Sequence, residues 1–217
     1  MNTFKNTKPV VAIDGTAGSG KGTLARNLAE KLNFDHLDTG ILYRIYAFEN
    51  QKKQGNIESI NLDKWLKNDQ KLAQLRTEEI SKIASIISQK KEVRDQLIEI
   101  QRKFADNPPG KNGSIIDGRD IGTVITPDAE IKFFIDANVE IRALRRIKQL
   151  NLNTEESKET LKNMIERDNQ DIKRQISPLR RAKDCFCIDT SNINENEVLA
   201  LALNHIKKKL ILFNNCI

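Results

Sequence analysis

The chain has 217 residues, of which 38% are hydrophobic and 30% are charged, which is typical of a soluble protein with one full α/β core. No apolar run is long enough to span a bilayer, and three cysteines without a Cys-x-x-Cys pair favour a reducing, cytoplasmic setting over a disulfide framework. The net charge of +6 fits either nucleic acid as a partner or a site for two anionic substrates.

The first element predicted is a strand over Val10–Ile13, followed by a glycine-rich segment and a helix to about Leu32, where Asn33 can end it. Strand, glycine turn and helix in this order are the setting of a phosphate-binding loop, in which backbone N–H groups surround phosphate oxygens. Lys21 would reach the β- and γ-phosphates, although a plain glycine-rich turn with a surface lysine is the alternative. The loop residues expected to bind the nucleotide are Gly15, Thr16, Ala17, Gly18, Ser19, Gly20, Lys21, Gly22 and Thr23.

The next stretch predicts a second strand at Phe34–Leu37, with Thr39 suited to be the N-cap of a helix over Ile41–Lys52. From Ser59 to Phe104 the pattern is polar and helical and contains no strand-like run, which predicts two or three helices outside the main sheet. A connector rich in turn residues follows at 106–113.

The second half of the chain alternates strands with helices. Strands are predicted at 114–116, 131–135 and 185–188, and helices at 139–150, 155–174 and 195–210. Together with the first half, this order predicts an α/β fold, a five-stranded parallel sheet with helices on both faces. Ligands of such sheets bind beyond the carboxyl ends of the strands, where this chain places Asp38, Asp117, Asp120, Asp136 and Asp189.

Cysteines and histidines carry no chemistry in this interpretation. Cys185 and Cys187 alternate in an apolar run, so we expect both to face one side of a buried strand as reduced thiols. His36 and His205 are isolated and are assigned neither a metal nor a catalytic role.

Arginines are concentrated in one part of the chain, whereas lysines are spread along it. Eight of the thirteen are Arg119, Arg142, Arg145, Arg146, Arg167, Arg174, Arg180 and Arg181. Because the guanidinium group matches phosphate oxygens, this clustering favours a phosphate site over a general polyanion surface. We expect Arg180 and Arg181, which follow a proline, to be surface residues.

A loop of this kind implies a nucleoside triphosphate and Mg²⁺, and phosphoryl transfer is catalysed mainly by positioning and charge neutralisation. A hydroxyl acceptor needs a general base, whereas a phosphate acceptor is mostly dianionic at neutral pH. The surplus of arginines favours a phosphate acceptor, with Asp38, Asp117 and Asp120 remaining open as bases.

The loop ends in Gly-Lys-Gly-Thr, with glycine where Ser or Thr is usual, as is normal in nucleoside monophosphate kinases. Four further motifs, in the same order and over nearly the whole chain, resemble those of bacterial cytidylate kinases. These motifs lie at residues 37–44, 76–79, 117–123 and 166–174.

The resemblance implies roles for matching positions around the acceptor. Thr39, Arg44 and Arg119 match residues that hold the acceptor's phosphate. Arg76 and Asp120 match residues that read the cytosine ring. Arg119 and Asp120 could instead pair with each other at the end of a strand.

Further positions match the sugar site and the lid. Asp171 matches the carboxylate that binds the sugar hydroxyl, and Arg167 and Arg174 match lid arginines that close on the phosphates. The expected catalytic set is therefore Lys21, Arg119, Arg167 and Arg174.

Other residues are placed near the donor and the metal. Arg142 and Arg145 are expected at the nucleotide, and it stays open whether Arg145 or Arg146 faces it. Asp117 and Thr23 are the candidates for Mg²⁺. Asp168 is left out of the site as a surface partner for an arginine or lysine.

The predicted organisation is a single kinase domain over 1–217. Its core is formed by 1–52 and 105–217, its helical monophosphate-binding region by 53–104 and its short lid by 148–178. Bacterial cytidylate kinases typically carry a small antiparallel sheet before the Arg-Thr motif, and this chain shows no strand-like run there. Any base-reading contact that this sheet supplies in the family is therefore expected to be missing here.

The resulting hypothesis is ATP-dependent phosphorylation of CMP and dCMP to CDP and dCDP, a step in pyrimidine nucleotide metabolism. The alternatives are a related kinase with relaxed or shifted base selectivity, UMP being the nearest acceptor, and a P-loop protein that binds nucleotide without catalysis. The expected partners are the nucleotides alone, without nucleic acid or membrane, and nothing in the sequence asks for more than a cytoplasmic monomer.

Overall fold

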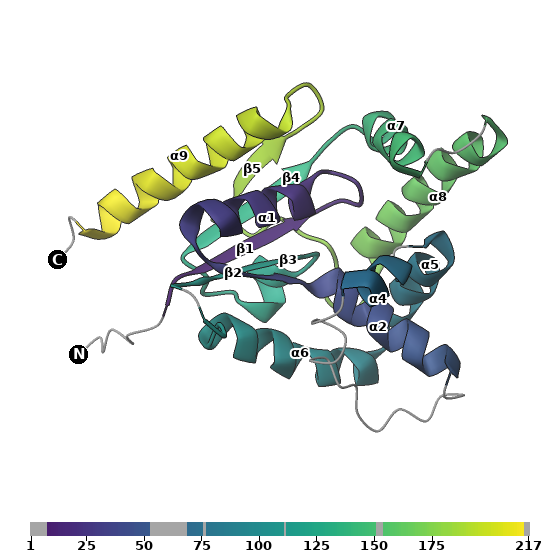
Figure 1. Cartoon of the computed structure of the whole chain (residues 1–217), viewed down its shortest axis with the longest axis horizontal. Coiled ribbons are helices and arrows are strands. Elements are labelled where there is room, and N and C mark those ends of the chain that lie inside the picture. Colours follow the sequence, from purple (N-terminus) through teal and green to yellow (C-terminus); the bar gives the residue numbers. More distant parts are fainter. Residues whose placement is uncertain (1–7, 53–68, 76, 111, 151–153, 215–217) are drawn as a thin grey trace. The chain divides into compact units, whose positions relative to one another are not determined.

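The computed structural model describes residues 8–52, 69–75, 77–110, 112–150 and 154–214. Five strands form a parallel sheet in the order β2-β3-β1-β4-β5 (Figure 1), which confirms the predicted fold class. The elements are β1 Val10–Gly15, α1 Lys21–Leu32, β2 Asp35–Asp38, α2 Thr39–Lys52, α4 Asp69–Gln74, α5 Glu78–Ile87, α6 Lys91–Asp106, β3 Ser114–Gly118, the π-helical turn η1 Ile121–Ile125, β4 Ile131–Asp136, α7 Val139–Leu150, α8 Thr154–Lys173, β5 Phe186–Asp189 and α9 Glu195–Asn214.

Strand β1 lies at the centre of the sheet, between β3 and β4. Asp14 is in register with Gly118 of β3, and Gly15 is in register with Ile135 of β4. The loops that follow these three strands therefore emerge side by side. This register places the glycine-rich loop next to the segment that begins at Arg119.

The two faces of β1 pack against different elements. Val11 and Ile13 belong to a hydrophobic cluster that includes Leu28 of α1 and Ile206 of α9. Helices α1 and α9 also contact each other, as the ribbon shows (Figure 1). The alternate residues face the opposite side, where the backbone of η1 bonds to Asp14. Alternation along one strand thus separates an apolar core from a polar contact.

Helix ends were partly predictable. Asn33 ends α1 in the left-handed conformation, with φ 53° and its N–H donated to the carbonyls of Ala29 and Glu30, which confirms the prediction. The helix α2, however, begins at Thr39, so the prediction that Thr39 is its N-cap is wrong. Asp38 directly precedes the helix instead. Its Oδ1 lies over the first turn, 3.0 Å from the position that a Cβ on Gly40 would take.

The prediction for the cysteines was right about their common side and wrong about burial. The Sγ atoms of Cys185 and Cys187 lie 3.7 Å apart, and both residues are free thiols. Cys187 is exposed and Cys185 is half-buried. The reason is that β5 is an edge strand, in which Phe186 and Ile188 face the core and the alternate side is open.

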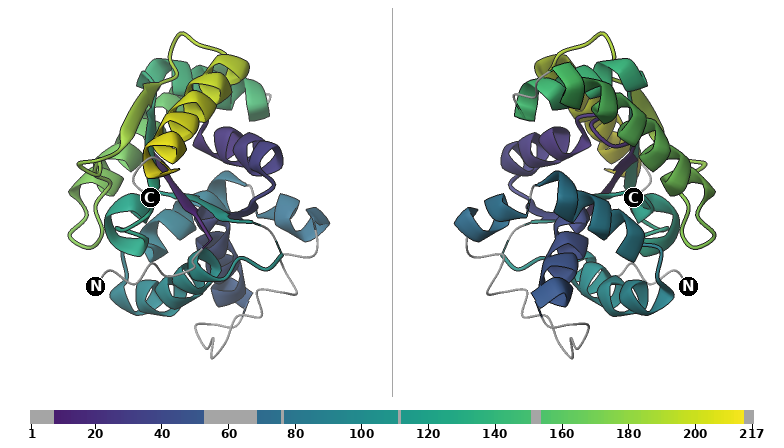
Figure 2. Two further views of the ribbon diagram at one scale, coloured as in Figure 1. Left: turned by 90° about the vertical axis from the view of Figure 1, so that its left-hand side faces the viewer. Right: turned by 90° about the vertical axis from the view of Figure 1, so that its right-hand side faces the viewer.

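Residues 1–37 with 102–217 form one compact unit, and residues 38–101 form a second. In the first unit α7 packs against α8 (Figure 2). The second unit is helical and includes α2 because α2 packs against α5. Thr77 begins α5 as its N-cap, its Oγ1 accepting the N–H of Ile80 at 3.2 Å.

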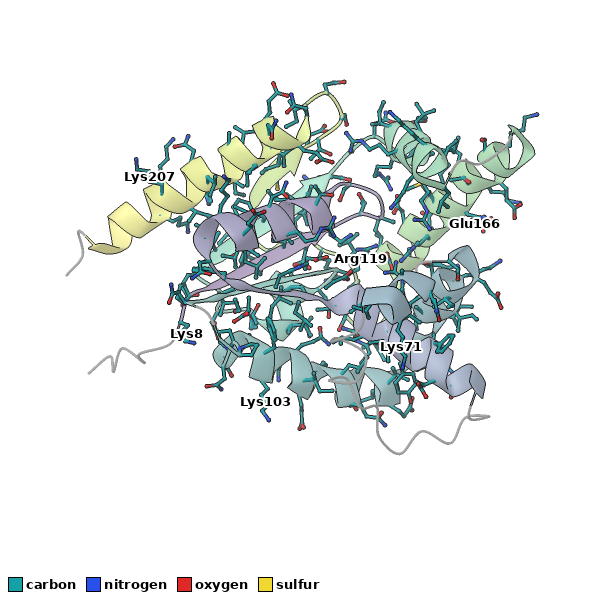
Figure 3. All side chains as sticks on the ribbon, viewed as in Figure 1. Lys8, Lys71, Lys103, Arg119, Glu166 and Lys207 are labelled. Atoms are coloured by element: carbon teal, nitrogen blue, oxygen red, sulfur yellow. The ribbon has the colours of Figure 1, made fainter. Side chains whose placement is uncertain are left out.

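Two lysines near the end of α9 face the solvent. Lys207 and Lys208 are exposed, and Lys207 points away from the ribbon of α9 (Figure 3). No described helix combines the length and the apolar character needed to cross a membrane.

The close approach of β1 to β4 makes a testable demand on Gly15. Its φ is 154°, and a Cβ at this position would lie 2.0 Å from the carbonyl oxygen of Ile135. We expect Gly15→Ala to lower the free energy of unfolding by at least about 2 kcal/mol, because backbone must move. Urea denaturation measures it, with Gly110→Ala as the control, since no atom lies within 4 Å of a Cβ there. Equal stability of the two variants would contradict this packing.

Candidate active site

The glycine-rich loop has the geometry of an anion site. Gly20 is the N-cap of α1, with φ 87°, and it has no side chain with which to bond the first N–H groups of the helix. No atom lies within 4 Å of the position that a Cβ of Gly20 would take. The start of α1 therefore presents N–H groups that no N-cap side chain binds, together with the positive end of its dipole, and a nucleotide's phosphates fit there.

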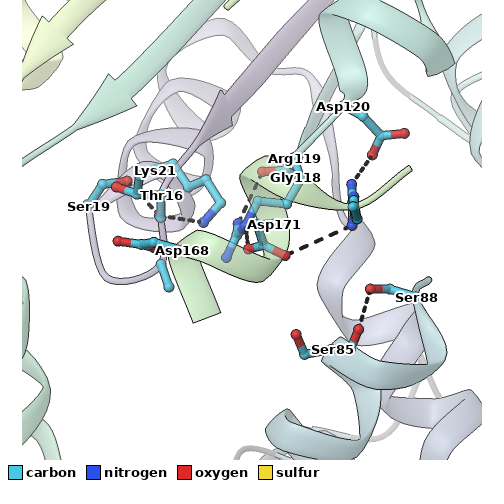
Figure 4. Close-up of polar contacts among 12 residues, drawn as sticks. Thr16, Ser19, Lys21, Ser85, Ser88, Gly118, Arg119, Asp120, Asp168 and Asp171 are labelled. Carbon is cyan, nitrogen blue, oxygen red and sulfur yellow. Dashed lines mark hydrogen bonds and ion pairs between the residues drawn. The ribbon is translucent and has the colours of Figure 1, made fainter. Parts of the chain in front are cut away.

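The loop is held in shape by its own polar groups. Ser19 Oγ donates to the carbonyl oxygen of Thr16 at 3.0 Å, and Lys21 Nζ donates to the same oxygen at 3.2 Å (Figure 4). The hydroxyl of Thr16 donates to Asp136 Oδ1 at the end of β4, over 2.8 Å. The carbonyl of Ser19 accepts the hydroxyl of Thr190 at 2.9 Å, beyond β5. The neighbouring strands thus fix the loop from outside.

Arg142 of α7 is buried, and its guanidinium braces the loop. It donates to the carbonyl oxygen of Ala17 at 3.0 Å, to that of Ala137 at 2.7 Å and to Asp168 Oδ2 at 2.6 Å. The expectation that Asp168 is a surface residue is wrong, because its side chain is only 14% exposed. Its pairing with an arginine is as expected, and the pair ties α8 to the loop.

The next two arginines of α7 point to different neighbours. Arg145 Nη1 donates to Thr190 Oγ1 at 3.0 Å, and Thr190 in turn bonds to the loop. Arg146 Nη1 donates to Gln149 on its own helix at 3.3 Å. Of the two, Arg145 is therefore the one that joins the residues around the loop.

Beyond β3, Arg119 is joined to the end of α8. Its Nε donates to Asp171 Oδ2 at 2.8 Å, and its Nη1 donates to the carbonyl oxygen of Gly118 at 3.1 Å (Figure 4). Arg174 lies 3.6 Å from Asp120 and 3.9 Å from Asp171. Arg119 and Asp120 therefore pair with residues of α8 and its end, and not with each other as one alternative had it.

The cluster is electrostatically coupled. Burial would raise the pKa of Asp171, but the charges of Arg119, Arg167 and Arg174 and the hydrogen bond from Arg119 outweigh burial, so this pKa lies below its ordinary value. Asp171 is therefore an anion at neutral pH, and Arg167 lies close enough to act on it.

Asp117 was predicted to lie in the site, and it has a partner that the sequence did not reveal. His36 Nε2 lies 2.7 Å from Asp117 Oδ2. Burial would raise the pKa of Asp117, but the bond to His36 and the charges of Lys21 and Arg119 hold it below its ordinary value. The influence of Lys21 shows that the end of β3 is electrically close to the loop.

Arg181 is exposed, as expected, and it also contacts residues of β4. Its Nη2 lies 3.5 Å from Asp136 Oδ2, and its guanidinium lies 5.0 Å from the ring centroid of Phe134. Asp136 thus binds Thr16 on one oxygen and faces Arg181 with the other. Arg180 is exposed.

Two of the predicted acceptor residues, Thr39 and Arg44, lie in α2 of the second unit. Thr39 is buried in the first turn of α2. Arg44 Nη1 lies 3.9 Å from the position of a Cβ at Gly40, so its guanidinium reaches back over that turn. Arg76 lies outside the described residues, as does most of the stretch in which the small sheet of related enzymes was expected to be missing.

Two polar residues were missed from the sequence, namely the buried Asp14 and the half-buried His36. Asp14 accepts the N–H groups of Ile121 and Gly122 at 2.7 and 2.8 Å. A carboxylate inside the apolar run of β1 was a visible signal for Asp14. His36 offered none, because its partner is 81 residues away.

A phosphate-binding loop at the centre of a parallel sheet, with an arginine cluster beyond the adjacent strand, defines a P-loop kinase. A gluconokinase from Sinorhizobium meliloti superposes with a TM-score of 0.52 at 10% identity, covering 97% of this chain and 99% of that chain, which shows the fold alone. The family model for cytidylate kinase matches residues 11–208, and the chain belongs to that family.

Curated relatives support the same family. The cytidylate kinase of Rhodospirillum rubrum is 41% identical over 211 residues, covering 92% of this chain and 98% of the relative. That of Paramagnetospirillum magneticum is 39% identical over 212 residues, with the same two shares.

The depressed pKa of Asp171 predicts how stability depends on pH. Its ionised form is favoured in the folded chain, so its contribution is present above the unfolded pKa of about 4 and is lost as pH falls through the lower folded pKa. We expect Asp171→Asn to lower the free energy of unfolding by about 2 kcal/mol or more at pH 7, because Arg119 is left unpaired. This difference should shrink below about pH 4.

Urea denaturation of both proteins between pH 7 and pH 3 measures this difference. Asp95→Asn is the control, since Asp95 pairs with Lys91 on the exposed face of α6 and should matter little. A deficit of Asp171→Asn that grows on acidification would contradict the assignment.

Proposed function

We propose that this chain transfers the γ-phosphoryl group of ATP to CMP and dCMP, giving CDP and dCDP. The observation that carries the proposal is an ionic cluster beyond β3, formed by Arg119, Asp120, Asp171 and Arg174. Strand β3 pairs with β1, and β1 leads into the phosphate-binding loop and the N-terminus of α1. One part suits the donor's phosphates and the other an anionic acceptor. Membership of the cytidylate kinase family supports cytidylate as that acceptor.

On the donor side, residues 15–23 bind the triphosphate through backbone N–H groups and Lys21. Lys21 Nζ now rests on the carbonyl of Thr16, from which it can turn to the β- and γ-phosphates. Arg142 and Arg145 act on the donor through the carbonyl of Ala17 and through Thr190, respectively, which shape the loop. The donor half is therefore organised before ATP arrives, which lowers the reorganisation needed during transfer.

On the acceptor side, Thr39, Arg44 and Arg119 are the residues we assign to the phosphate of CMP. The acceptor needs no general base because its phosphate, with a second pKa of about 6, is mostly dianionic at neutral pH. Asp171 is assigned to the sugar hydroxyl, and Arg76 with Asp120 to the cytosine ring. The ionised state of Asp171 suits it to accept a hydroxyl hydrogen bond.

During transfer, charge develops between donor and acceptor, and we assign Arg167 and Arg174 to neutralise it. The contacts of Arg174 with Asp120 and Asp171, at 3.6 and 3.9 Å, are long enough to be exchanged for phosphate oxygens. Exclusion of water by residues 148–178 would favour transfer over hydrolysis.

We assign Mg²⁺ to the donor phosphates, where Thr23 and Asp117 would hold it, Asp117 through a water molecule. In the described part of the chain, no group of three or more His, Cys, Asp or Glu residues could hold a metal by itself. A hydroxyl and one carboxylate nevertheless fit Mg²⁺, which keeps several waters and binds mainly through substrate phosphates. The ion would shield charge on the transferred group. We expect a cytoplasmic monomer with nucleotides as its partners.

Substrate assignment is tested by a coupled assay with ATP, Mg²⁺ and each of CMP, dCMP, UMP, AMP and GMP. We expect turnover with CMP and dCMP and much weaker turnover with UMP. A preference for UMP would overturn the acceptor alone. Binding of ATP without turnover of any monophosphate would overturn the kinase assignment and favour a non-catalytic nucleotide-binding protein.

The role of Arg119 is tested by Arg119→Ala in the same assay. We expect a loss on the order of 10²-fold or more in kcat/KM for CMP, because a charge that faces the transition state is removed. Arg180→Ala is the control, since Arg180 is an exposed arginine with no assigned role. A loss under threefold for Arg119→Ala would mean that Arg119 is structural.

A further inference from the structure

Asp14 is a buried carboxylate that the proposed mechanism does not use. It lies at the end of β1, directly before Gly15, and its side chain is almost completely shielded, with 3% exposure of the residue. Burial raises the pKa of Asp14 to about 7, while the two backbone N–H groups that it accepts act against that rise. A carboxylate in such a place is costly unless both oxygens are bonded.

Both oxygens are indeed bonded, and to successive residues of one segment. Oδ1 accepts the N–H of Ile121 at 2.7 Å, and Oδ2 accepts the N–H of Gly122 at 2.8 Å. These residues begin η1, whose internal bonds start later, from the N–H groups of Val124 and Ile125 to the carbonyl of Asp120. The first N–H groups of the turn have no partner within the turn, and Asp14 supplies one for each.

The other end of the same turn is held by a cation. Arg102 Nε donates to the carbonyl oxygen of Ile125 at 3.2 Å, and its Nη2 donates to that of Val124 at 3.0 Å. A carboxylate at the N–H end and a guanidinium at the carbonyl end match the direction of the peptide dipoles. Five residues of unusual helical geometry are therefore fixed at both ends.

The N–H end is the one that matters for the site, because Asp120 immediately precedes Ile121. Arg119 and Asp120 reach α8 and its end through Asp171 and Arg174. On the other side, Asp14 is followed by Gly15, the first residue of the phosphate-binding loop. A single carboxylate thus joins the donor loop to the segment that carries two acceptor residues.

We propose that Asp14 is a positioning residue, which holds Arg119 and Asp120 at the distance from the phosphate-binding loop that in-line transfer requires. The inference rests on the proposed function, because it acts through residues assigned there to the acceptor. It goes further by assigning to β1 a part in acceptor binding, whereas β1 otherwise only leads into the donor loop. Positioning errors near 1 Å are enough to lower rates by about 10²-fold.

The test is Asp14→Asn, which keeps size and shape. One amide oxygen can accept only one of the two N–H groups at this geometry, and the new NH₂ group faces the other donor. We expect KM for CMP to rise about tenfold and kcat to fall about tenfold. KM for ATP should stay within about twofold, because the loop is held independently by Asp136, Thr190 and Arg142.

Glu130→Gln is the matched control. Glu130 Oε2 accepts the N–H of Val10 at 2.8 Å, so it is also a carboxylate bonded to backbone, but at the opposite end of β1. A purely structural role for Asp14 predicts that both variants lose stability and keep their KM values for CMP. The positioning role predicts that KM rises for CMP but not for ATP, and only in Asp14→Asn. Equal kinetic changes in the two variants, or an unchanged KM for CMP, would overturn the proposal.

Hydrogen exchange in the unmodified chain provides a second measurement that does not depend on the variant folding. The amide protons of Ile121 and Gly122 should exchange far more slowly than that of Asp128, an exposed turn residue whose N–H donates to no group in the described part of the chain. Exchange as fast as at Asp128 would overturn the premise. If the unmodified enzyme failed to phosphorylate CMP, the proposed function would be wrong, and the exchange rates would still decide whether Asp14 holds this segment.

Discussion

The close packing of β1 between β3 and β4 is the constraint on which the rest of the site depends. Where Gly15, with φ 154°, passes Ile135, a side chain would overlap the carbonyl oxygen of the neighbouring strand, so only glycine fits at this point of the pairing. The loops after these strands consequently begin within reach of short side chains. Asp136 can bond Thr16, and Asp14 can bond the start of η1, only because of this proximity.

Buried charges in the cluster beyond β3 add little to stability, yet they suit binding. Taking Arg119 and Asp171 out of water costs several kcal/mol per ion, and their mutual attraction approximately offsets it. Loss of one partner strongly destabilises the folded protein, because the other charge is left buried and unpaired. Replacement of one partner by another group of the same charge avoids this cost. A phosphate that replaces a carboxylate beside Arg119 or Arg174 meets a guanidinium that is already desolvated and oriented.

Patterns with a local cause were predictable from the sequence. The strand order along the chain, the glycine loop and the helix end at Asn33 each follow from neighbouring residues, and the structure confirms them. The turn η1 was missed, because five residues show no periodicity and its stability comes from the distant side chains of Asp14 and Arg102. The exposure of Cys187 was missed for a similar reason, since the sequence does not reveal which strand is at the edge.

Not every arginine near the phosphate-binding loop is available to bind phosphate. Arg142 uses its guanidinium on two carbonyl oxygens and on Asp168, and Arg145 uses its guanidinium on Thr190. Both lie next to the phosphate-binding loop, but they bind the backbone that shapes it. The clustering of arginines in the sequence therefore indicates anionic ligands only for those arginines whose partners are carboxylates near the loop.

That distinction separates two uses of the same residue. An arginine bonded to carbonyl oxygens has no reason to release them when a phosphate binds, because several charge-assisted bonds would be lost at once. An arginine paired with a carboxylate can exchange that carboxylate for a phosphate, since a phosphate also carries negative charge and offers more oxygens. Arg119 and Arg174 meet this condition at their contacts with Asp171, and each also donates to one carbonyl oxygen, that of Gly118 and that of Ser177, respectively. Arg142 meets the condition at one of its three contacts. The site therefore consists of a rigid donor loop braced by arginines and an acceptor cluster whose arginines can exchange partners.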